Sequence, residues 1–375
     1  MSEKRLTDEG WVMGLRRLVV LTLVLALTGA FVDSASASGT TYYAAPGGVS
    51  SGPCDQANPC AFSYALSKLA CGDTLLAAGT HSTPYVEDVM RTLPIICTPT
   101  RPIMVMPLAR SAPIIKGLVW LTSPTWLDWN NVDVTWNPTG HNSSQYMMKM
   151  NGGGNWTIEN SQLSGAKSSA ALYITKSSSL DPVPSNWKVQ YDCIHDTFES
   201  NDANQDQLIY VNIGTATNSG GLITRNLLFN GPNGWGVKLA GPSSGNFDAA
   251  GVSVTYNTIY NTGGANILVG WTSKANILDH NLLDRTGGEK GGGGNADANL
   301  RGYGLTNNTT VYSNTAGYEA FDGLLEKDYP KVTGSGLVDA SDNIYPGGSP
   351  TFDTLSCSGF HPGDLVAQSY GRYAP

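Results

Sequence analysis

Short apolar, β-branched segments recur along the chain, and a small polar residue interrupts each of them at the same place. The segment 251–264, GVSVTYNTIYNTGG, alternates apolar and polar positions, stops at Asn257 and then resumes. Similar segments surround Asn226, Asn281 and Asn314. Alternation with a period of two is typical of a strand with one buried face, so each segment predicts two short strands joined at a corner.

One polar residue of each segment falls in a single column when the segments are aligned. The members of this column are Asn130, Ser161, Asp192, Asn226, Asn257, Asn281, Asn314 and Asn343. Successive members are 24 to 34 residues apart, and an apolar residue, such as Leu127 for Asn130, stands three positions before each. A repeat of this length, built from short strands without helical periodicity, is typical of a solenoid. Asn tolerates a left-handed backbone at a tight corner, and stacked Asn amides can bond from coil to coil, so we interpret the column as structural.

A further strand follows each corner, and its alternation predicts which side chains face solvent. The residues expected to point inward are Met148, Leu172, Ile209, Val237, Ile267 and Leu300. Their outward neighbours are Lys149, Tyr173, Tyr210, Lys238, Leu268 and Arg301, followed by a second outward row of Asn151, Thr175, Asn212, Ala240, Gly270 and Tyr303. Residues at equal register in a parallel stack lie about 4.8 Å apart, so the first of these rows predicts a cationic and aromatic stripe. The alternative is an ordinary polar surface, because outward strand residues are polar by default.

Composition fits this interpretation and narrows the range of partners. The chain has 375 residues, of which 41% are hydrophobic and 14% charged, enough for a large core in one domain or two. Its 44 Gly and 20 Pro suit an all-β protein with many turns. The net charge of -8 argues against nucleic acid or an anionic membrane as the main partner.

The first 37 residues are predicted to be an export signal. Arg16 and Arg17 precede an apolar run that is short for a membrane span, and Ala35 and Ala37 frame a small-residue cleavage site. Cleavage after Ala37 leaves residues 38–375 as the secreted protein, extracellular or periplasmic, with no membrane partner. We expect 41–116 to form an N-terminal cap and the first coils, 117–345 the main coils, and 346–375 a C-terminal cap.

Six cysteines in an exported chain predict disulfides. Pairing Cys54 with Cys60 and Cys71 with Cys97 closes short loops, whereas Cys193 and Cys357 are isolated in the sequence. The connectivity stays open at this point.

The opening segments carry a family resemblance. TYYAAPGG (41–48) and NPCAFSYALSKLACGDTLLAAGTHS (58–82), together with the repeated coils, resemble the right-handed parallel β-helix proteins of the pectate-lyase-like superfamily. The resemblance covers roughly residues 41–345 and implies an all-β, single-domain, right-handed parallel β-helix with an N-terminal capping helix. The superfamily includes polysaccharide lyases, glycoside hydrolases, epimerases, esterases and phage tailspikes, so the resemblance leaves the activity open.

The outward row favours a lyase that cleaves a uronic-acid polysaccharide by β-elimination. Aromatic platforms suit sugar rings, Lys and Arg suit carboxylates, and relatives in this superfamily use Lys, Arg or Tyr on the outward strand face. We expect Lys238 to be the base, Arg301 to bind the substrate carboxylate and Tyr210 to be the acid, or the base if Lys238 only neutralises charge. The residues expected to bind substrate are Lys149, Tyr173, Asn212, Tyr303 and His195. The partner is then an anionic polysaccharide and the enzyme a monomer; the chain lacks the RxPxxR motif of pectate lyases, which argues against pectate itself.

An acidic loop between two predicted strands suggests a calcium site. The residues expected to hold the ion are Glu199, Asp202 and Asp206, because calcium takes carboxylate and carbonyl oxygens from flexible loops. The loop lacks the spacing of an EF-hand, so a solvated acidic loop is the alternative.

Two other functions fit the same sequence. A β-helix glycoside hydrolase needs two carboxylates across the scissile bond, for which Asp206, Asp322 and Glu326 are available. A non-catalytic solenoid for carbohydrate binding or adhesion needs only that the outward row binds without reacting.

Overall fold

The computed structural model describes the chain in a series of segments from residue 39 onward. The described residues are 39–93, 96–176, 181–198, 206–213, 219–239, 249–270, 273, 275–286, 300–303, 309–312, 315–316, 337–339, 356–357 and 372. All of them belong to the compact unit Ser38–Pro375, and the other unit, Met1–Ala37, is the segment expected to be the export signal. The boundary between the units coincides with the predicted cleavage position, while cleavage itself stays a prediction.

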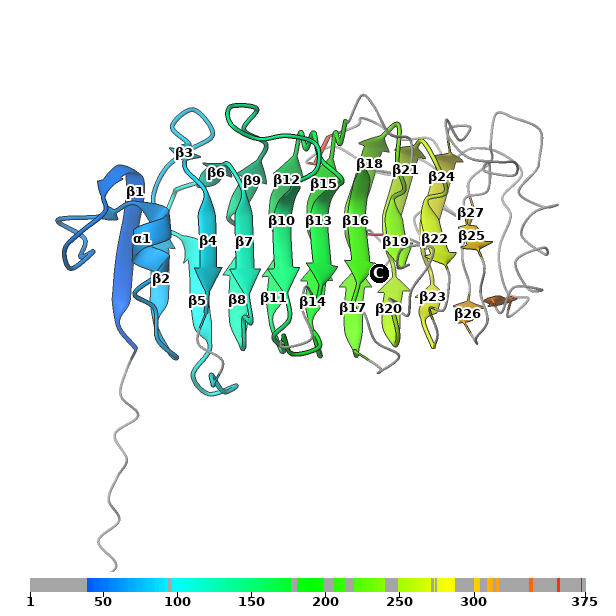
Figure 1. The fold of residues 1–375 in the computed structure, drawn as a ribbon, viewed down its shortest axis with the longest axis horizontal. Coiled ribbons are helices and arrows are strands. Elements are labelled where there is room, and N and C mark those ends of the chain that lie inside the picture. The colour runs from blue at the N-terminus through cyan, green and yellow to red at the C-terminus, as the bar shows by residue number, and fades with distance from the viewer. Residues whose placement is uncertain are drawn as a thin grey trace, which may run out of the picture. The chain divides into compact units, whose positions relative to one another are not determined.

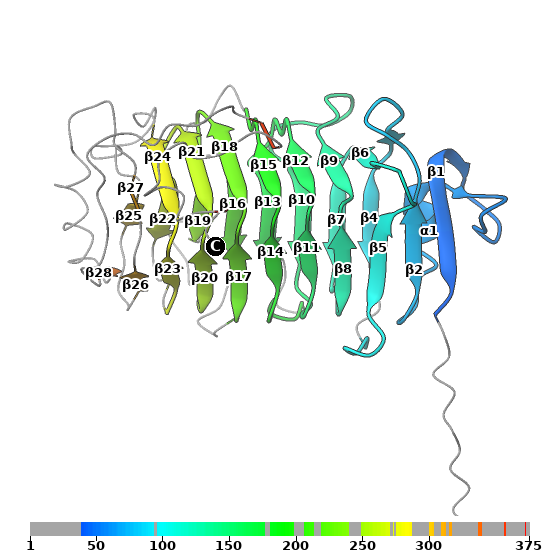
Figure 2. The ribbon, with the colours of Figure 1, turned by 180° about the vertical axis from the view of Figure 1, so that it is seen from behind.

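The described chain is an all-β parallel solenoid of three sheets, whose successive strands lie side by side in Figure 1 and, from behind, in Figure 2. The first sheet contains β1 (Thr41–Val49), β2 (Thr74–Ala77), β5 (Ile103–Pro107), β8 (Leu127–Asn130), β11 (Thr157–Glu159), β14 (Lys188–Gln190), β17 (Gly221–Thr224), β20 (Val252–Thr255), β23 (Ile277–Asp279), β26 (Thr309–Tyr312) and β28 (Leu337–Asp339). The second contains β4 (Val89–Thr92), β7 (Val119–Thr122), β10 (Tyr146–Asn151), β13 (Ala170–Thr175), β16 (Gln207–Asn212), β19 (Val237–Leu239), β22 (Ile267–Gly270) and β25 (Leu300–Tyr303). The third contains β3 (Tyr85–Val86), β6 (Ile114–Lys116), β9 (Asp133–Thr135), β12 (Gln162–Ser164), β15 (Cys193–His195), β18 (Leu227–Gly231), β21 (Thr258–Thr262), β24 (Leu282–Thr286) and β27 (Thr315–Ala316). One short helix, α1 (Phe62–Leu66), lies between β1 and β2 in the sequence.

Each coil visits the three sheets in the same order. Strand β7 of the second sheet leads to β8 of the first and β9 of the third, and the chain returns to the second sheet at β10. Every pairing between strands of successive coils is parallel among the described residues. The alternation of apolar and polar residues explains this architecture, because one face of every strand can then turn to a shared core. The predicted parallel β-helix is confirmed.

The residues predicted to point inward on the second sheet are buried. Their exposed fractions are 0 or 1% for all six, which are Met148, Leu172, Ile209, Val237, Ile267 and Leu300. They belong to one continuous core that also holds the fully buried Trp129, Trp156 and Trp187. The rings of Trp156 and Trp187 stack with their centroids 5.5 Å apart, so aromatic side chains repeat inside the solenoid from one coil to the next.

The predicted capping helix is present at the N-terminal end, beside the first coils in Figure 1. Phe62 packs against the rings of Tyr85 and Trp129, at centroid distances of 5.3 and 5.6 Å. The carboxylate of Glu87 accepts hydrogen bonds from the backbone N–H groups of Phe62 and Ser63, both at 2.9 Å. These N–H groups have no partner within a helix, so Glu87 both caps α1 and ties it to the solenoid. No helix in the described ranges has the length and apolarity needed to cross a bilayer.

The polar column forms a ladder of side-chain amides at the corner between the first and third sheets. Asn226 donates its backbone N–H and its Nδ2 to Oδ1 of Asn257, at 3.0 and 2.9 Å, and Asn257 makes the same two bonds to Asn281, both at 3.0 Å. Each Nδ2 also donates to a backbone carbonyl of the preceding coil, that of Ile223 for Asn257. All three side chains are fully buried, so the ladder satisfies backbone groups that water cannot reach.

The left-handed residue of each corner is not the ladder residue, contrary to our expectation. Positive φ angles occur one position earlier, with φ of 59° at Tyr191, 55° at Arg225, 55° at Tyr256 and 52° at His280. The ladder Asn is therefore required for the hydrogen bonds of its side chain, and the preceding residue adopts the left-handed backbone conformation.

The placement of Asn130 in the column was wrong by two residues. Asn130 pairs with Glu159 in the register between β8 and β11, which leaves Val132 opposite Ser161. Trp129, not Leu127, then matches Ile158. Val132 has no polar side chain to mark the corner. Its backbone N–H still donates to the side chain of the next coil, Oγ of Ser161, at 3.2 Å, as the N–H groups of Asn226 and Asn257 do.

Three disulfides use all six cysteines of the chain. Cys54–Cys60 and Cys71–Cys97 lie near the N-terminal end, in the pairing that closes short loops. Cys193–Cys357 spans 164 residues and joins β15 to the C-terminal segment. Disulfides, which the cysteine content of an exported chain predicted, are therefore present.

Asp192 occupies a ladder position where later coils have Asn. It donates its backbone N–H to Asn226 at 2.9 Å, and its Oδ1 accepts from the backbone N–H of Ser161 at 2.8 Å. Its Oδ2 is buried and has no hydrogen-bond partner. Burial raises the pKa of the Asp192 carboxyl well above its usual value, and the attraction of Arg372 opposes that rise without cancelling it.

Replacement of Asp192 by Asn should therefore stabilise the protein at neutral pH, by about 1–3 kcal/mol, because an amide can donate where a carboxylate oxygen cannot. Because folding raises the pKa of this carboxyl, it destabilises the folded protein increasingly as pH rises above the unfolded pKa of about 3.9. The advantage of Asp192→Asn should therefore shrink below about pH 4. Urea unfolding of both proteins from pH 3 to pH 8 measures the difference. Asn257→Asp is the reverse control and should destabilise most at neutral pH; an advantage of Asp192→Asn that grows toward low pH would contradict this account.

Candidate functional site

The outward row of the second sheet has the predicted register on every strand. Lys149 pairs with Tyr173, Tyr173 with Tyr210, Tyr210 with Lys238, Lys238 with Leu268, and Leu268 with Arg301. We call the residues Lys149, Tyr173, Tyr210, Lys238, Leu268 and Arg301 the outer row. The second outward row is also in register, with Asn151, Thr175 and Asn212 on consecutive strands and Gly270 opposite Tyr303, while Ala240 lies outside the described residues.

The two tyrosines of the outer row stack along the solenoid together with Tyr146, which lies outside the row. The ring of Tyr146 lies 4.0 Å from that of Tyr173, and Tyr173 lies 4.9 Å from Tyr210. Tyr173 and Tyr210 are only 8 and 9% exposed. They face outward as predicted but are not the open platforms that we expected, because each ring covers the next.

The two lysines of the outer row extend this stack at both ends. Nζ of Lys149 lies 5.5 Å from the ring centre of Trp120 and 5.9 Å from that of Tyr173. Nζ of Lys238 lies 4.9 Å from the ring centre of Tyr210. Cation–π attraction of this kind contributes about 0.5–2 kcal/mol per pair, so the lysines and the rings hold each other in place.

The sequence reasoning missed Trp120 and Tyr146. Trp120 lies opposite Lys149 on the preceding coil, at the register of the outer row. Aligning LVWLT with the later strands could have found it. Tyr146 lies three residues before Lys149, at the first position of β10, so register alone does not assign it to the row. Its backbone carbonyl accepts a hydrogen bond of 2.7 Å from Nε1 of Trp120, which joins the two aromatic residues.

The electrostatics of the row keep its phenols protonated. Burial raises the pKa of Tyr173 and that of Tyr210, and for Tyr210 the nearby Tyr173 adds to the effect. Nδ2 of Asn212 donates to both hydroxyl oxygens, at 3.5 Å to Tyr173 and 3.4 Å to Tyr210. Burial lowers the pKa of Lys149, and the negative charge of Asp181 opposes that shift. The row can therefore offer neutral hydroxyl donors beside amines.

Arg301 and Tyr303 are described through their backbone alone. Both lie on β25, where Arg301 continues the outer row beyond Leu268 and Tyr303 continues the second row beyond Gly270. Leu268 is 6% exposed and packs with Trp235 and Ala265. An apolar patch thus separates Lys238 from the strand that carries Arg301.

His195 is not brought to the outer row. It ends β15 on the third sheet, where Nδ1 lies 2.7 Å from Oδ2 of Asp196 and Nε2 lies 2.8 Å from Nε2 of Gln162. Its ring stacks on that of Phe229 at 4.8 Å. Its contacts tie it to the third sheet, so the expected role in binding substrate has no support from its position.

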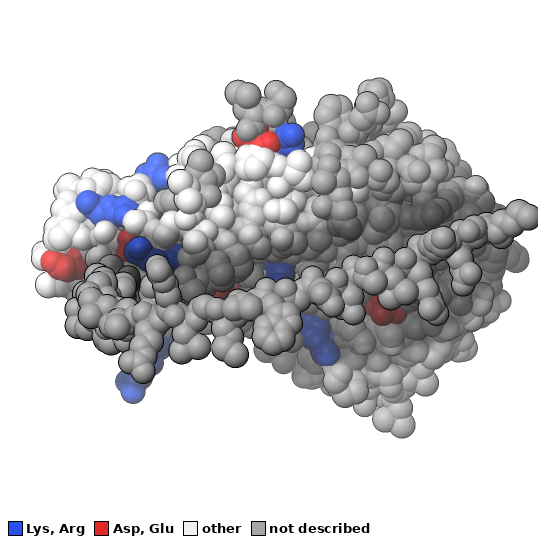
Figure 3. Space-filling view, turned by 90° about the horizontal axis from the view of Figure 1, so that it is seen from below, with Lys and Arg blue, Asp and Glu red and all other residues white. Residues whose placement is uncertain are grey.

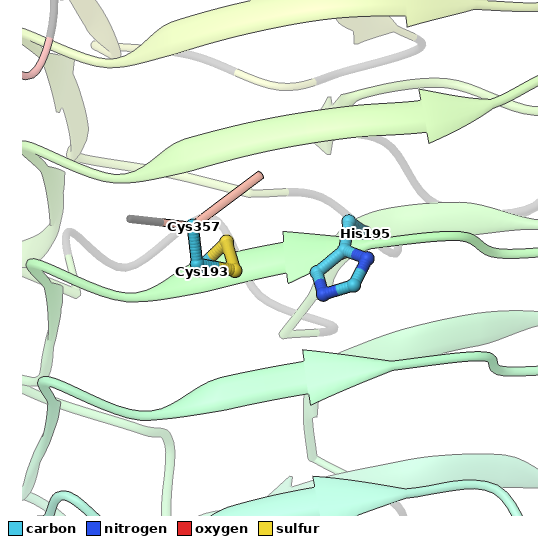
Figure 4. A group of neighbouring side chains, drawn as sticks. All are labelled: Cys193, His195 and Cys357. Carbon is cyan, nitrogen blue, oxygen red and sulfur yellow. A yellow bond between two sulfur atoms is a disulfide. The ribbon is translucent and has the colours of Figure 1, made fainter. Parts of the chain in front are cut away.

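The neighbours of His195 do not form a metal centre. Cys193, His195 and Cys357 lie close together in Figure 4, and this is the one group of three or more such ligands found in the described parts of the chain. The two sulfur atoms are bonded to each other as a disulfide, so neither is a thiolate that could hold a metal ion.

The expected calcium loop falls mostly outside the described residues. Glu199 and Asp202 lie outside them, and Asp206 is fully buried, with its backbone carbonyl accepting a 2.9 Å hydrogen bond from Oγ1 of Thr197. Among the described residues, Asp206 belongs to no group of three or more His, Cys, Asp or Glu side chains placed to share an ion. Calcium binding stays a prediction.

The charged residues on one face of the molecule do not separate by sign. Figure 3, which views the molecule from below, shows described Lys and Arg residues interspersed with Asp and Glu. No broad basic surface, such as nucleic-acid binding would need, is visible among the described residues of this face.

Comparison with known proteins identifies the fold. No protein-family model and no curated protein sequence matches the chain. Among solved structures, a rhamnogalacturonan lyase is similar with a TM-score of 0.50 and 13% identity, covering 74% of each chain. A lacto-N-biosidase from Eubacterium ramulus has a TM-score of 0.44 and 12% identity, over 83% of this chain and 67% of that one. The pectate lyase Pel9A has a TM-score of 0.40 and 14% identity, over 86% of this chain and 84% of that one. At 13% identity the likeness to the rhamnogalacturonan lyase bears on the fold alone and leaves the reaction open.

Tyr173 is the centre of the aromatic stack, and Tyr173→Ala should destabilise the protein by about 3 kcal/mol, since it removes a buried ring with two stacked neighbours. Tyr173→Phe keeps the ring and loses only the hydrogen bonds of the hydroxyl with Thr175, Tyr146 and Asn212, so it should destabilise the protein less than Tyr173→Ala does. Chemical denaturation measures both. Equal effects of the two variants would show that the stack does not stabilise the fold.

Proposed function

We propose that the protein is a secreted polysaccharide lyase that cleaves a uronic-acid polysaccharide by β-elimination on the outward face of the second sheet. The observation that carries the proposal is the outer row, in which Lys149, Lys238 and Arg301 stand at one register together with two tyrosines. On a chain with a net charge of -8, this local run of cations matches a polyanionic chain lying along the solenoid. The three disulfides fit an exported protein. The fold is also that of the rhamnogalacturonan lyase, which agrees with the proposal and does not choose the reaction.

The reaction assigns a separate task to each member of the row. Lys238, in its neutral form, takes the proton from the carbon beside the substrate carboxylate. The electrons of that C–H bond form a carbon–carbon double bond as the glycosidic C–O bond breaks, and Arg301 stabilises the negative charge that develops on the carboxylate. Tyr210 then donates its proton to the departing glycosidic oxygen. Burial raises the pKa of Tyr210, so the phenol carries the proton that this step needs at neutral pH.

The remaining residues of the two rows bind and orient the sugar chain. Lys149 attracts carboxylates of neighbouring sugar units, and Asn212 fixes the hydroxyls of Tyr173 and Tyr210 through its two hydrogen bonds. Tyr303 extends the second row along the same face. No step is assigned to calcium, and its predicted role is to be tested by adding a chelator to the activity assay.

Binding without reaction is the second candidate function. The burial of Tyr173 and Tyr210 and the cation–π contacts of Lys149 and Lys238 favour it, because groups that are held by one another are suited to a rigid binding surface. The hydrolase alternative is less supported: Asp206 is buried, and Asp322 and Glu326 lie outside the described residues.

A screen of anionic polysaccharides separates these functions. β-Elimination creates an unsaturated uronate that absorbs ultraviolet light, whereas hydrolysis releases reducing ends without that absorbance. Retention of a polysaccharide in a native gel without either product would indicate binding alone.

On a substrate that the wild type cleaves, Lys238→Ala should lower turnover by at least about a hundredfold, because it removes the base. Tyr210→Phe should lower turnover comparably while keeping the ring on which Lys238 and Tyr173 pack. The matched control is Lys116→Ala on the third sheet, which should keep full activity. Initial rates from ultraviolet absorbance measure each effect, and thermal unfolding confirms that the variants are folded. Full activity of both Lys238→Ala and Tyr210→Phe would place the active site elsewhere.

A further inference from the structure

A groove of about 390 Å³ lies on the outward face of the first sheet, away from the outer row on the second. Its floor is formed by three consecutive strands, β8, β11 and β14, and the segment before β5 adds one wall. One end of the groove is apolar, with Met104 and Trp126, and the rest is polar, with Asp128, Glu159, Lys188 and Gln190. A hollow of this size with one aromatic wall and several convergent polar groups is typical of a small-ligand site.

Register explains how the polar groups converge. Asp128, Thr157 and Lys188 pair across the three strands, and Glu159 lies two residues beyond Thr157 on the same face. Asp128 and Glu159 are therefore diagonal neighbours, with Cα atoms about 8 Å apart from strand spacing and rise. Both carboxyl groups line the same groove.

The two carboxyl groups have different surroundings. The carboxylate of Glu159 accepts hydrogen bonds from two side-chain amides, Nδ2 of Asn130 at 2.6 Å and Nε2 of Gln190 at 2.7 Å. Asp128 has a buried Oδ1 without a hydrogen-bond partner. Burial, and then the charge of Glu159, raises the pKa of Asp128 to about 6. Asp128 thus lines the groove with a carboxyl group that has one oxygen shielded from solvent, whereas the carboxylate of Glu159 is already fixed by amides.

Trp126 is held in a strained conformation at the apolar end. Its φ is 50°, in the left-handed region that a bulky side chain rarely adopts. The carbonyl of Trp126 accepts a hydrogen bond from the N–H of Ile103, at 2.8 Å, and its N–H donates to the carbonyl of Gly154, at 3.0 Å. The indole packs partly against the core, so its remaining surface in the groove is fixed in orientation.

We propose that this groove is a binding site for an uncharged sugar residue, which stacks on Trp126 and donates hydroxyl hydrogen bonds to Asp128 and Glu159. Indole faces bind the C–H faces of sugar rings, and carboxylates are strong acceptors for sugar hydroxyls. Lys188 and Gln190 supply donors at the opposite end. A uronate is disfavoured, because its carboxylate would face Glu159 and Asp128 at close range. The site stands apart from the proposed lyase site and does not depend on it.

Binding of xylotetraose, cellotetraose and mannotetraose, with tetragalacturonate as the charged comparison, tests the proposal by titration calorimetry on the full chain. At least one neutral oligosaccharide should bind more tightly than tetragalacturonate to a protein whose outer row is disabled by Lys238→Ala. Trp126→Ala should weaken that binding by roughly tenfold. Because Trp126 also touches the core, a second variant is needed that leaves the fold intact.

Thr157→Tyr is that variant, since it fills the floor of the groove from an outward position on β11. Its matched control is Ser253→Tyr, which adds the same ring at the same register on β20, beyond the groove. Loss of neutral-sugar binding in Thr157→Tyr, with binding kept in Ser253→Tyr and Lys238→Ala, supports the proposal. Binding that survives Thr157→Tyr, binding only of tetragalacturonate, or no binding of any neutral probe overturns it. Failure of the lyase proposal appears separately, as full elimination activity in both Lys238→Ala and Tyr210→Phe.

Discussion

Equal register between successive coils is the constraint on which the rest of this structure depends. Parallel backbone hydrogen bonds hold each residue opposite its counterpart one coil away, so a side chain repeated at the coil spacing becomes a continuous column. Inside the solenoid this produces one apolar core, and at one corner it produces the ladder from Asn226 to Asn281. On the second sheet it places Tyr173 opposite Tyr210, and their rings stack. A slip of one residue in any coil would turn its core side chains to solvent, so the columns reinforce one another.

Much of the fold could be predicted because it depends on two periods, alternation within a strand and the spacing between coils. These are enough for the parallel solenoid, for the inward residues such as Met148 and Leu172, and for the register from Lys149 to Arg301. The error at Asn130 arose where Val132 occupies the corner and provides no polar marker. The same two-residue error in the alignment hid the groove. It placed Asp128 opposite Glu159, whereas in the structure Asp128 lies opposite Thr157.

Other features could not be predicted, because they depend on contacts between coils and not on the period. Alternation assigns Tyr210 to the outward face, but its burial follows from the ring of Tyr173 and the amine of Lys238 beside it. The left-handed residue of each corner, Tyr256 for example, is set by the way two strands join and has no consistent residue type. The position of His195 on the third sheet likewise follows from its hydrogen bonds with Gln162 and Asp196.

The two outward faces differ in chemistry although one core supports both. The second sheet presents amines and phenols, and the first presents a groove with a carboxyl pair beside an indole. Since each coil contributes separate residues to each face, one face can change without disturbing the packing of the other. Under the two proposals, the solenoid would contact two chemically different parts of one heterogeneous polymer.

The disulfide between Cys193 and Cys357 changes how this solenoid bears mechanical load. In a linear stack, tension on the C-terminal segment would peel away the last coil first and proceed one coil at a time. Here the covalent bond delivers such tension directly to β15, in the middle of the stack. The strands from β18 onward then lie within a closed covalent loop, outside the covalent path of the pull. A protein that grips a long polymer while its own tail is held elsewhere would keep those coils folded under strain.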